Sequence, residues 1–311
     1  MKNFLYTLAF CLLSIMSLAQ TTDRGIRLAD PTIFVENGTY YLYGTGSANG
    51  FPVYTSTDLV KWQPHTQLAL TKGDSYGTKG FWAPQIWKNK DRYFMAYTAD
   101  EHIAIASSDS PLGPFKQATI RPVSMGGRQI DPFVFKDQDG RFYLYHVRLQ
   151  NGNRIFVSHL KDDLSDVADT SGVECISAKA TWENTANAQW PVTEGPTVTR
   201  IGALYYLFYS ANDFRNIDYA VGYATAPSPT GPWTRFTANP IISRSNTDRN
   251  GSGHGDVFTD KQGQLWYVLH THSSNDQVEK RRTAIVKLRL NNGQFTMVPG
   301  SFRYLESEAA K

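Results

Sequence analysis

Five segments of the chain repeat one pattern of apolar and polar positions. In each, a short run of branched and aromatic residues is followed, after a few turn-forming residues, by a second run that carries two adjacent aromatic side chains. Alternation with a period of two predicts half-buried strands, and a turn such as Asn37-Gly38 predicts a tight hairpin. The aromatic pairs are Tyr40-Tyr41, Tyr93-Phe94, Phe142-Tyr143, Tyr205-Tyr206 and Trp266-Tyr267.

The first run of each unit reads DPTIF, APQIW, DPFVF, EGPTV and HGDVF, at residues 30–34, 83–87, 131–135, 194–198 and 254–258. A third strand-like run follows in every unit, and no long segment has helical periodicity. Self-similarity at a spacing of about 50 to 60 residues is typical of propellers, whose blades are four-stranded sheets. The sequence therefore predicts an all-β fold, a five-bladed β-propeller, as a single catalytic domain over residues 20–311.

The first residues have the pattern of a secretory signal. Lys2 precedes an apolar run over residues 4–18, and Ala19 offers a small residue for cleavage. The run is shorter than the ~20 residues of a membrane span, so a membrane anchor is the weaker alternative. We expect a signal peptide at residues 1–19 and a protein exported to the periplasm or the outside of the cell. Without that segment Cys175 is the remaining cysteine, which excludes an intramolecular disulfide.

The composition of the chain limits the classes of binding partner that we expect. The chain has 311 residues, 41% of them hydrophobic, with 31 basic and 28 acidic side chains and a formal net charge of +3. It shows no basic stripe interleaved with aromatic residues, which is the pattern expected of a nucleic-acid-binding surface. We expect a globular monomer with no nucleic-acid partner and no membrane span.

One position of the repeat is occupied mostly by ionisable residues. The first residue of the inner-strand run is Asp30, Ala83, Asp131, Glu194 and His254 in blade order. Because inner strands line the central channel of a propeller, these side chains are expected to converge. A single Asp before a proline is usually a turn residue, but three clustered carboxylates repel one another and raise some of their pKa values. Carboxylates gathered in a cleft suit acid–base cleavage of glycosidic bonds.

The five motifs LADPTIF, FWAPQIW, QIDPFVF, VTEGPTV and SGHGDVF occur in one order and spacing that resembles glycoside hydrolase family 43. The resemblance spans the chain after the signal peptide. It implies a five-bladed propeller enzyme that cleaves arabinofuranosides or xylosides with inversion. It also implies roles for the three acids: Asp30 as general base, Asp131 as the residue that orients and tunes the acid, and Glu194 as general acid.

The resemblance implies two further contacts. His254 matches the axial histidine of the family, which lies near a bound calcium ion or a water cluster. Arg281 is the better match to a sugar-contacting arginine, and the neighbouring Arg282 is the alternative because adjacent residues of a strand face opposite sides. No cofactor is expected to be required. A structural calcium ion on the propeller axis would be mostly water-coordinated, with His254 as a peripheral contact.

Three aromatic residues are candidates for stacking on a sugar: Trp82 beside the channel position of the second unit, and Phe51 and Trp190 in or near channel-side loops. Packing between blades is an equal alternative for each of them.

The expected function is an exo-acting α-L-arabinofuranosidase that removes single arabinose units from plant cell-wall polysaccharide or oligosaccharides. A β-xylosidase and an endo-arabinanase of the same family are alternatives. An invertase-like fructosidase is a weaker alternative, because its Asn-Asp-Pro-Asn opening is absent here. A carbohydrate-binding propeller without catalysis is the alternative that is not an enzyme.

Overall fold

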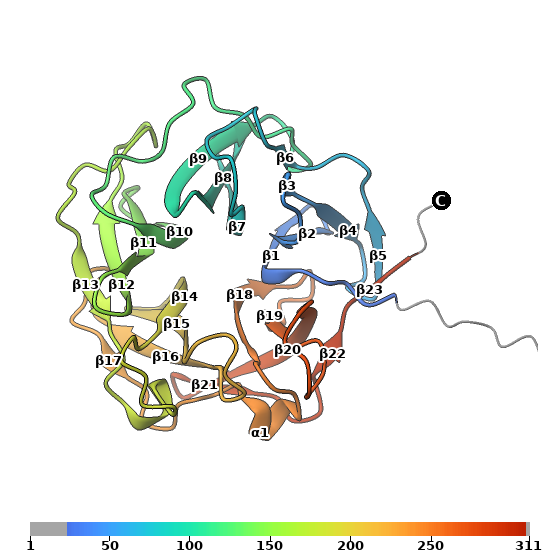
Figure 1. Cartoon of the computed structure of the whole chain (residues 1–311), viewed down its shortest axis with the longest axis vertical. Helices are drawn as coiled ribbons and strands as arrows, with labels where there is room; N and C mark the ends of the chain where they lie inside the picture. The colour runs from blue at the N-terminus through green and yellow to red at the C-terminus, as the bar shows by residue number, and fades with distance from the viewer. Residues whose placement is uncertain (1–23, 309–311) are drawn as a thin grey trace, which may run out of the picture.

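The computed structural model describes residues 24–308 and arranges them as a ring of β-sheets around a central axis (Figure 1). The expected five-bladed β-propeller is confirmed. The predicted signal peptide lies outside the described residues, and the domain boundaries stay a prediction. The strands nearest the axis are β1 (Ala29–Glu36), β7 (Trp82–Asn89), β10 (Gln129–Lys136), β14 (Thr193–Ile201) and β18 (Gly253–Thr259).

Each inner strand pairs antiparallel with the next strand of its blade across a short turn. Asn37 and Gly38 both have positive φ angles, 50° and 76°, as a type I′ hairpin turn requires. The second strands are β2 (Thr39–Thr45), β8 (Arg92–Ala99), β11 (Phe142–Leu149), β15 (Leu204–Ala211) and β19 (Leu265–Thr271).

The outer strands complete the blades unequally. The second blade has three strands in the described chain, while the others have four or five. The outer strands are β4 (Val53–Ser56) and β5 (Lys61–Pro64) in the first blade, β9 (His102–Ser108) in the second, β12 (Asn153–His159) and β13 (Val173–Ile176) in the third, β16 (Ala220–Ala226) and β17 (Thr234–Arg235) in the fourth, and β20 (Arg282–Asn291), β21 (Gln294–Met297) and β22 (Arg303–Tyr304) in the fifth.

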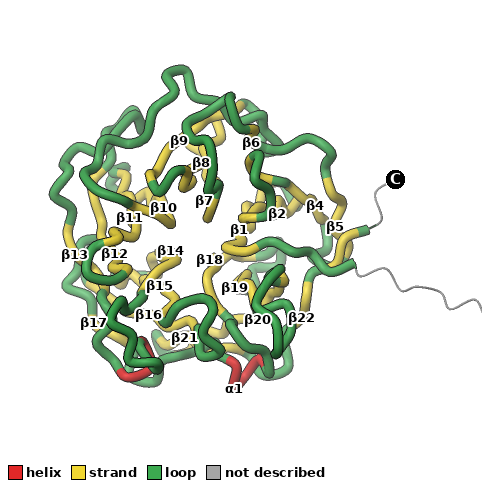
Figure 2. The backbone as a smooth tube through the Cα atoms, in the orientation of Figure 1, coloured by secondary structure: helices red, strands yellow, loops and turns green. Residues whose placement is uncertain are grey.

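A few short strands and helices lie outside the main sheets of the blades. A two-stranded pair joins β3 (Gly50–Phe51) to β6 (Leu70–Thr71), and the helices η1 (Thr181–Glu183) and α1 (Arg244–Thr247) lie at its periphery (Figure 2). Between residues 24 and 308, no helix combines the length and the apolar composition needed to cross a membrane.

The core of the described chain consists of apolar clusters between neighbouring blades. Between the first two blades, for example, Phe51 packs edge-on against Phe81 and Tyr97, with ring centroids 6.0 and 5.6 Å apart. Because each blade is covered on both faces, its strands are apolar on both faces, and the aromatic pairs of the sequence supply this packing.

The ring closes by interleaving residues from both ends of the described chain. The strand β23 (Glu306–Ser307) pairs parallel with β5 of the first blade, and β22 pairs with β20 of the fifth. The Ile26 N–H donates to the Leu305 carbonyl at 2.9 Å, and the Thr283 N–H donates to the Ile26 carbonyl at 2.9 Å. In Figure 1 the blue and red ends of the chain meet at this junction. Closure therefore joins the first and fifth blades through backbone hydrogen bonds.

Candidate active site

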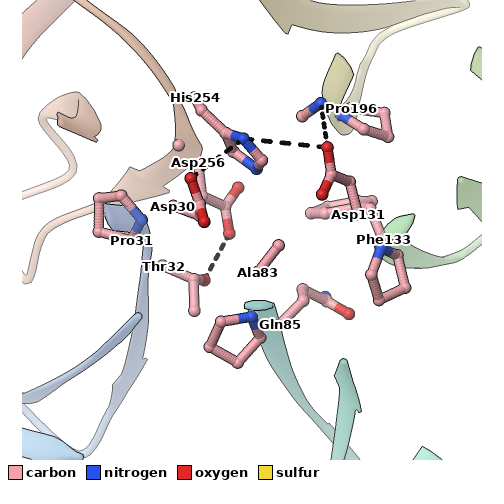
Figure 3. A pocket seen from close by; sticks show the side chains of 14 residues that line it. Asp30, Pro31, Thr32, Ala83, Gln85, Asp131, Phe133, Pro196, His254 and Asp256 are labelled. Atoms are coloured by element: carbon pink, nitrogen blue, oxygen red, sulfur yellow. Dashed lines mark hydrogen bonds and ion pairs between the residues drawn. The ribbon is translucent and has the colours of Figure 1, made fainter. Parts of the chain in front are cut away.

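Every inner strand has the same backbone irregularity, and the residues at this irregularity form part of the site. Near its beginning, the pairing with the next strand shifts, and one residue there has a positive φ angle between 42° and 58°. This conformation is strained for residues other than glycine, so the surrounding structure must hold it. The five residues are Asp30, Ala83, Asp131, Gly195 and His254, and all of them line a small cavity on the axis (Figure 3).

The fourth blade differs from the sequence alignment by one residue. Gly195, and not Glu194, has the strained position, whereas Glu194 has the same register as Trp82 and Ile130 of the preceding blades. A Cβ atom on Gly195 would lie 2.7 Å from the imidazole of His254, so glycine is needed there for space as well as for its φ angle. The offset places Glu194 outside the axial cavity, in the pocket above it.

That pocket has a volume of about 280 Å³ and is where most of the predicted site residues meet. Trp82 is 38% exposed at its wall. Trp190 lines a neighbouring groove instead. Phe51 is fully buried between blades, so the structure does not bring it to the pocket. The predicted residues that line the pocket are Asp30, Trp82, Asp131, Glu194, His254 and Arg281.

Asp30 lies beside an arginine, two imidazoles and a hydroxyl donor. Its carboxylate accepts a hydrogen bond from the Thr45 hydroxyl at 2.7 Å, and it lies 3.3 Å from Arg281 Nη1 and 3.3 Å from His254 Nδ1. Burial alone would raise the pKa of Asp30, but the charges of His254, Arg281 and His270 and the Thr45 hydroxyl together hold it well below its usual value. Burial lowers the pKa of both imidazoles, so Arg281 is the cation that persists near neutral pH.

The two adjacent arginines face different surroundings. The guanidinium of Arg281 lies over the ring of Phe214 at 4.3 Å and beside Asp30, whereas that of Arg282 lies over the ring of Tyr304 at 3.6 Å. Arg281 is therefore the arginine that lines the pocket.

Glu194 has neutral partners. Tyr219 donates its hydroxyl hydrogen to Oε1 at 2.9 Å, and Asn153 donates from Nδ2 to Oε2 at 3.0 Å. Burial, helped by the negative charges of Asp30 and Asp213, outweighs these two hydrogen bonds and raises the pKa of Glu194 to about 7. The carboxyl group is thus substantially protonated near neutral pH.

Asp131 is buried and is affected by the charges of both other acids. Its Oδ2 accepts the Gly195 N–H at 3.2 Å and lies 3.9 Å from His254 Nδ1 (Figure 3). Burial, followed by repulsion from Glu194 and Asp30, raises the pKa of Asp131 well above its usual value, against the opposing effect of the Gly195 N–H. Two such neighbours cannot both be charged without strong repulsion, so the Asp131–Glu194 pair retains a proton near neutral pH.

A repeated hydrogen bond holds the strained residues. At four blade junctions, the strained residue donates its N–H to a polar side chain on the second strand of the preceding blade. These bonds are Asp30 to His270 at 3.0 Å, Ala83 to Thr45 at 3.0 Å, Asp131 to Thr98 at 2.9 Å and His254 to Ser210 at 2.7 Å. At the remaining junction this register position is Val147, which cannot accept, and the Gly195 N–H bonds to Asp131 instead.

The axial cavity is where a structural calcium ion was expected, and its size and lining residues bear on that expectation. Its volume of about 20 Å³ has room for about one water molecule. The Asp256 carboxylate there accepts hydrogen bonds from the Thr32 and Thr197 hydroxyls, and burial raises its pKa to about 6. Within residues 24–308, no three His, Cys, Asp or Glu side chains gather as a metal site. The residues present do not fit a calcium ion with its water shell.

Several site residues were missed from the sequence: Thr45, Asn153, Asp213, Phe214, Tyr219 and His270. For Thr45 and His270 a signal existed, because a polar residue lies at or next to the end of the second strand, at the same register position of four blades, as Thr45, Thr98, Ser210 and His270. The others lie in loops or strand ends that follow no repeat.

Comparisons with known proteins found a family match and similar solved structures. Residues 25–295 match the family model described as glycosyl hydrolases family 43. A solved structure described as an endo-1,4-beta-xylanase from Bacteroides thetaiotaomicron is 36% identical, covers 92% of this chain and 99% of that chain, and superposes with a TM-score of 0.87.

Two curated relatives are similar over most of their length. The beta-D-galactofuranosidase xynD of Aspergillus niger is 26% identical, with 83% of this chain and 78% of that protein covered. The extracellular exo-alpha-(1->5)-L-arabinofuranosidase ArbA of Cellvibrio japonicus is 25% identical, with 81% of each covered. Relatives of similar identity to this chain thus carry names for different sugars.

Proposed function

Because the chain belongs to glycosyl hydrolase family 43, whose members hydrolyse glycosidic bonds with inversion, we propose that its pocket removes a terminal sugar by the action of three carboxyl groups. Asp30 is the general base, Glu194 is the general acid, and Asp131 keeps the acid protonated and oriented. The fructosidase and the non-catalytic binding propeller do not fit this family membership.

The proposed step balances as a single displacement. Asp30 accepts a proton from a water molecule whose oxygen forms a bond to the anomeric carbon on one face of the sugar. Glu194 donates its proton to the glycosidic oxygen as the bond on the opposite face breaks. Solvent then restores both protonation states. Attack opposite to departure gives a product of inverted configuration.

One observation supports this division of roles above all. Asp30 and Glu194 are buried to nearly the same degree, 9% and 8% exposed, yet their pKa values move in opposite directions, below the usual value for Asp30 and up to about 7 for Glu194. A pair of carboxyl groups whose surroundings separate their pKa values is what acid–base hydrolysis needs near neutral pH.

For the sugar, we propose an exo-acting α-L-arabinofuranosidase that releases arabinose from plant polysaccharide side chains, outside the cytoplasm. Its support is the pocket of about 280 Å³, which is small for a ligand site and suits a single sugar ring, together with relatives named for arabinofuranoside cleavage outside the cell. The signal-like first 19 residues favour export.

A second candidate is a xylan-directed enzyme, a β-xylosidase in the first instance. The observation in its favour is the 36% identity to the protein described as an endo-1,4-beta-xylanase. A further relative, at 27% identity, is named as an endo-arabinanase from Bacillus subtilis, which keeps endo action on linear arabinan as an alternative.

Product analysis separates these candidates. Branched arabinan, linear arabinan and xylo-oligosaccharides are each incubated with the enzyme, and the first products are identified by chromatography and by NMR of the anomeric proton. Free arabinose from the branches supports the proposal. Oligosaccharides from linear arabinan would assign endo-arabinanase, xylose alone would assign β-xylosidase, and a first product of retained configuration would overturn the mechanism.

A further inference from the structure

A groove lies next to the catalytic pocket. It has a volume of about 580 Å³, and Val192 and Asp213 line both the groove and the pocket. Two large apolar side chains in it face solvent, Trp190 at 46% and Ile217 at 43% exposure. An exposed indole at the edge of a sugar pocket is a surface on which a sugar ring can stack. We call this site the Trp190 groove, formed by Trp190, Pro191, Val192, Asp213, Arg215 and Ile217.

The groove connects to the general acid through one side chain. Trp190 donates from Nε1 to Asn153 Oδ1 at 2.8 Å, and Asn153 donates from Nδ2 to Glu194 Oε2 at 3.0 Å. Since Glu194 protonates the leaving oxygen in the proposed reaction, a groove on its side of the pocket lies where the departing part of the substrate must be.

The direction of these hydrogen bonds has a chemical effect. A side-chain amide has an acceptor end and a donor end. With its oxygen held by Trp190, Asn153 presents only donor hydrogens to Glu194, so the amide cannot accept the acid's proton. In the reverse orientation its oxygen would accept a hydrogen bond from protonated Glu194 and stabilise that form, which would raise the pKa of the acid and withhold the proton from the substrate.

We propose that the Trp190 groove binds the sugar unit on the leaving-group side of the bond, and that Trp190 is also a positioning residue that fixes Asn153 with its donor end toward Glu194. The ligand is thus the continuing chain of an oligosaccharide or polysaccharide, not a small aglycone. The inference rests on the proposed function, because it takes Glu194 as the acid.

The first experiment compares two changes at one position. Trp190→Phe keeps an aromatic face but removes the Nε1–H, and Trp190→Ala removes both. Each is assayed on an oligosaccharide that the wild type cleaves and on the nitrophenyl glycoside of the same terminal sugar. We expect Trp190→Ala to raise KM for the oligosaccharide by about tenfold and to change KM for the nitrophenyl glycoside little. Trp190→Phe should preserve KM for both.

The second readout is the pH profile. Trp190→Phe should move the alkaline limb of kcat/KM to higher pH and lower kcat on the oligosaccharide, because Asn153 is free to turn its oxygen to Glu194. In an Asn153→Ala background the same change should have no further effect on the limb. Leu204→Ala is the matched control, since Leu204 is a similarly exposed apolar residue, at 41%, at the start of β15.

The outcomes separate the two claims. An unchanged alkaline limb in Trp190→Phe would overturn the positioning role, and an unchanged oligosaccharide KM in Trp190→Ala would overturn the binding role. If the wild type cleaves no glycoside, the proposed function fails, and calorimetric titration of an arabino- and a xylo-oligosaccharide against the Asp30→Asn variant still tests the groove. Loss of affinity on adding Trp190→Ala supports it, and equal affinity or no binding contradicts it.

Discussion

The two sides of the catalytic pocket each bury one carboxyl group to nearly the same degree, but they shift its pKa in opposite directions. On the side formed by the first and fifth blades, Asp30 faces Arg281, two imidazoles and a threonine hydroxyl. On the side formed by the third and fourth blades, Glu194 has only the neutral donors Tyr219 and Asn153. Burial is matched, so the neighbours decide which group is ionised. The difference between acid and base therefore depends on the basic and hydroxyl neighbours of Asp30 more than on the choice of Asp or Glu.

The largest effect is expected from Asp30→Asn. Without a base, kcat should fall by about 10²–10⁴-fold or more, on activated and unactivated substrates alike, because water must be deprotonated in both cases. The measurement is kcat across aryl glycosides of graded leaving-group pKa. A loss confined to poor leaving groups would exchange the two roles.

Glu194→Gln should have a more selective effect. Substrates with poor leaving groups need the proton and should lose about 10²–10⁴-fold in kcat, while activated aryl glycosides should lose far less. The same series of aryl glycosides measures this as a steeper dependence of the rate on leaving-group pKa. Equal losses across the series would show that Glu194 does not act as the acid.

The pH dependence of activity tests whether Arg281 lowers the pKa of Asp30. The wild type needs Asp30 ionised and Glu194 protonated, so activity should persist to low pH and decline as the pH rises through about 7, where Glu194 ionises. Arg281→Met removes the cation and should raise the pKa of Asp30, moving the acidic limb up by about 1–3 units.

Arg282→Met is the control for that change. Its guanidinium lies over Tyr304, so the limb should stay where it is in the wild type. An acidic limb that does not move in Arg281→Met would assign the low pKa of Asp30 to other groups.

The smallest effect concerns the blade junction without the repeated hydrogen bond. Val147→Thr supplies the hydroxyl acceptor found at the equivalent place in other blades, and the Gly195 N–H should turn from Asp131 to that hydroxyl. Asp131 then loses one hydrogen bond, its pKa rises further, and kcat should fall by about fivefold, the value of one net hydrogen bond. Val147→Ala, which adds no acceptor, should leave the Gly195 N–H on Asp131. Equal kcat values for the two variants would contradict this use of Val147.

The sequence predicted the blades well because their signals are local. Alternation, turn residues and aromatic pairs recur in each unit, and packing between neighbouring blades needs nothing more than these. The convergence of Asp30, Asp131 and Glu194 followed from the repeat itself.

The sequence predicted less where one residue of register matters. The pattern aligned Glu194 with Asp30, but the strained position falls on Gly195, a choice set by contact with His254 from another blade. Phe51 and Trp190 had equal standing as loop aromatics. One is buried and the other exposed, because the burial of a loop residue depends on blades distant in sequence.

The closure of the ring has a consequence for the order in which the enzyme assembles. The acid side comes from segments closer in sequence, because Asn153 and Tyr219 are 41 and 25 residues from Glu194. The base side joins Asp30 to Arg281, 251 residues apart, and the strands that hold them together include β23. Contacts this distant carry the larger entropy cost of loop closure, so we expect them to form later in folding than the contacts of the acid side. A partly folded chain would hold its acid without its base, and the return of hydrolysis during refolding would report the closing of the ring.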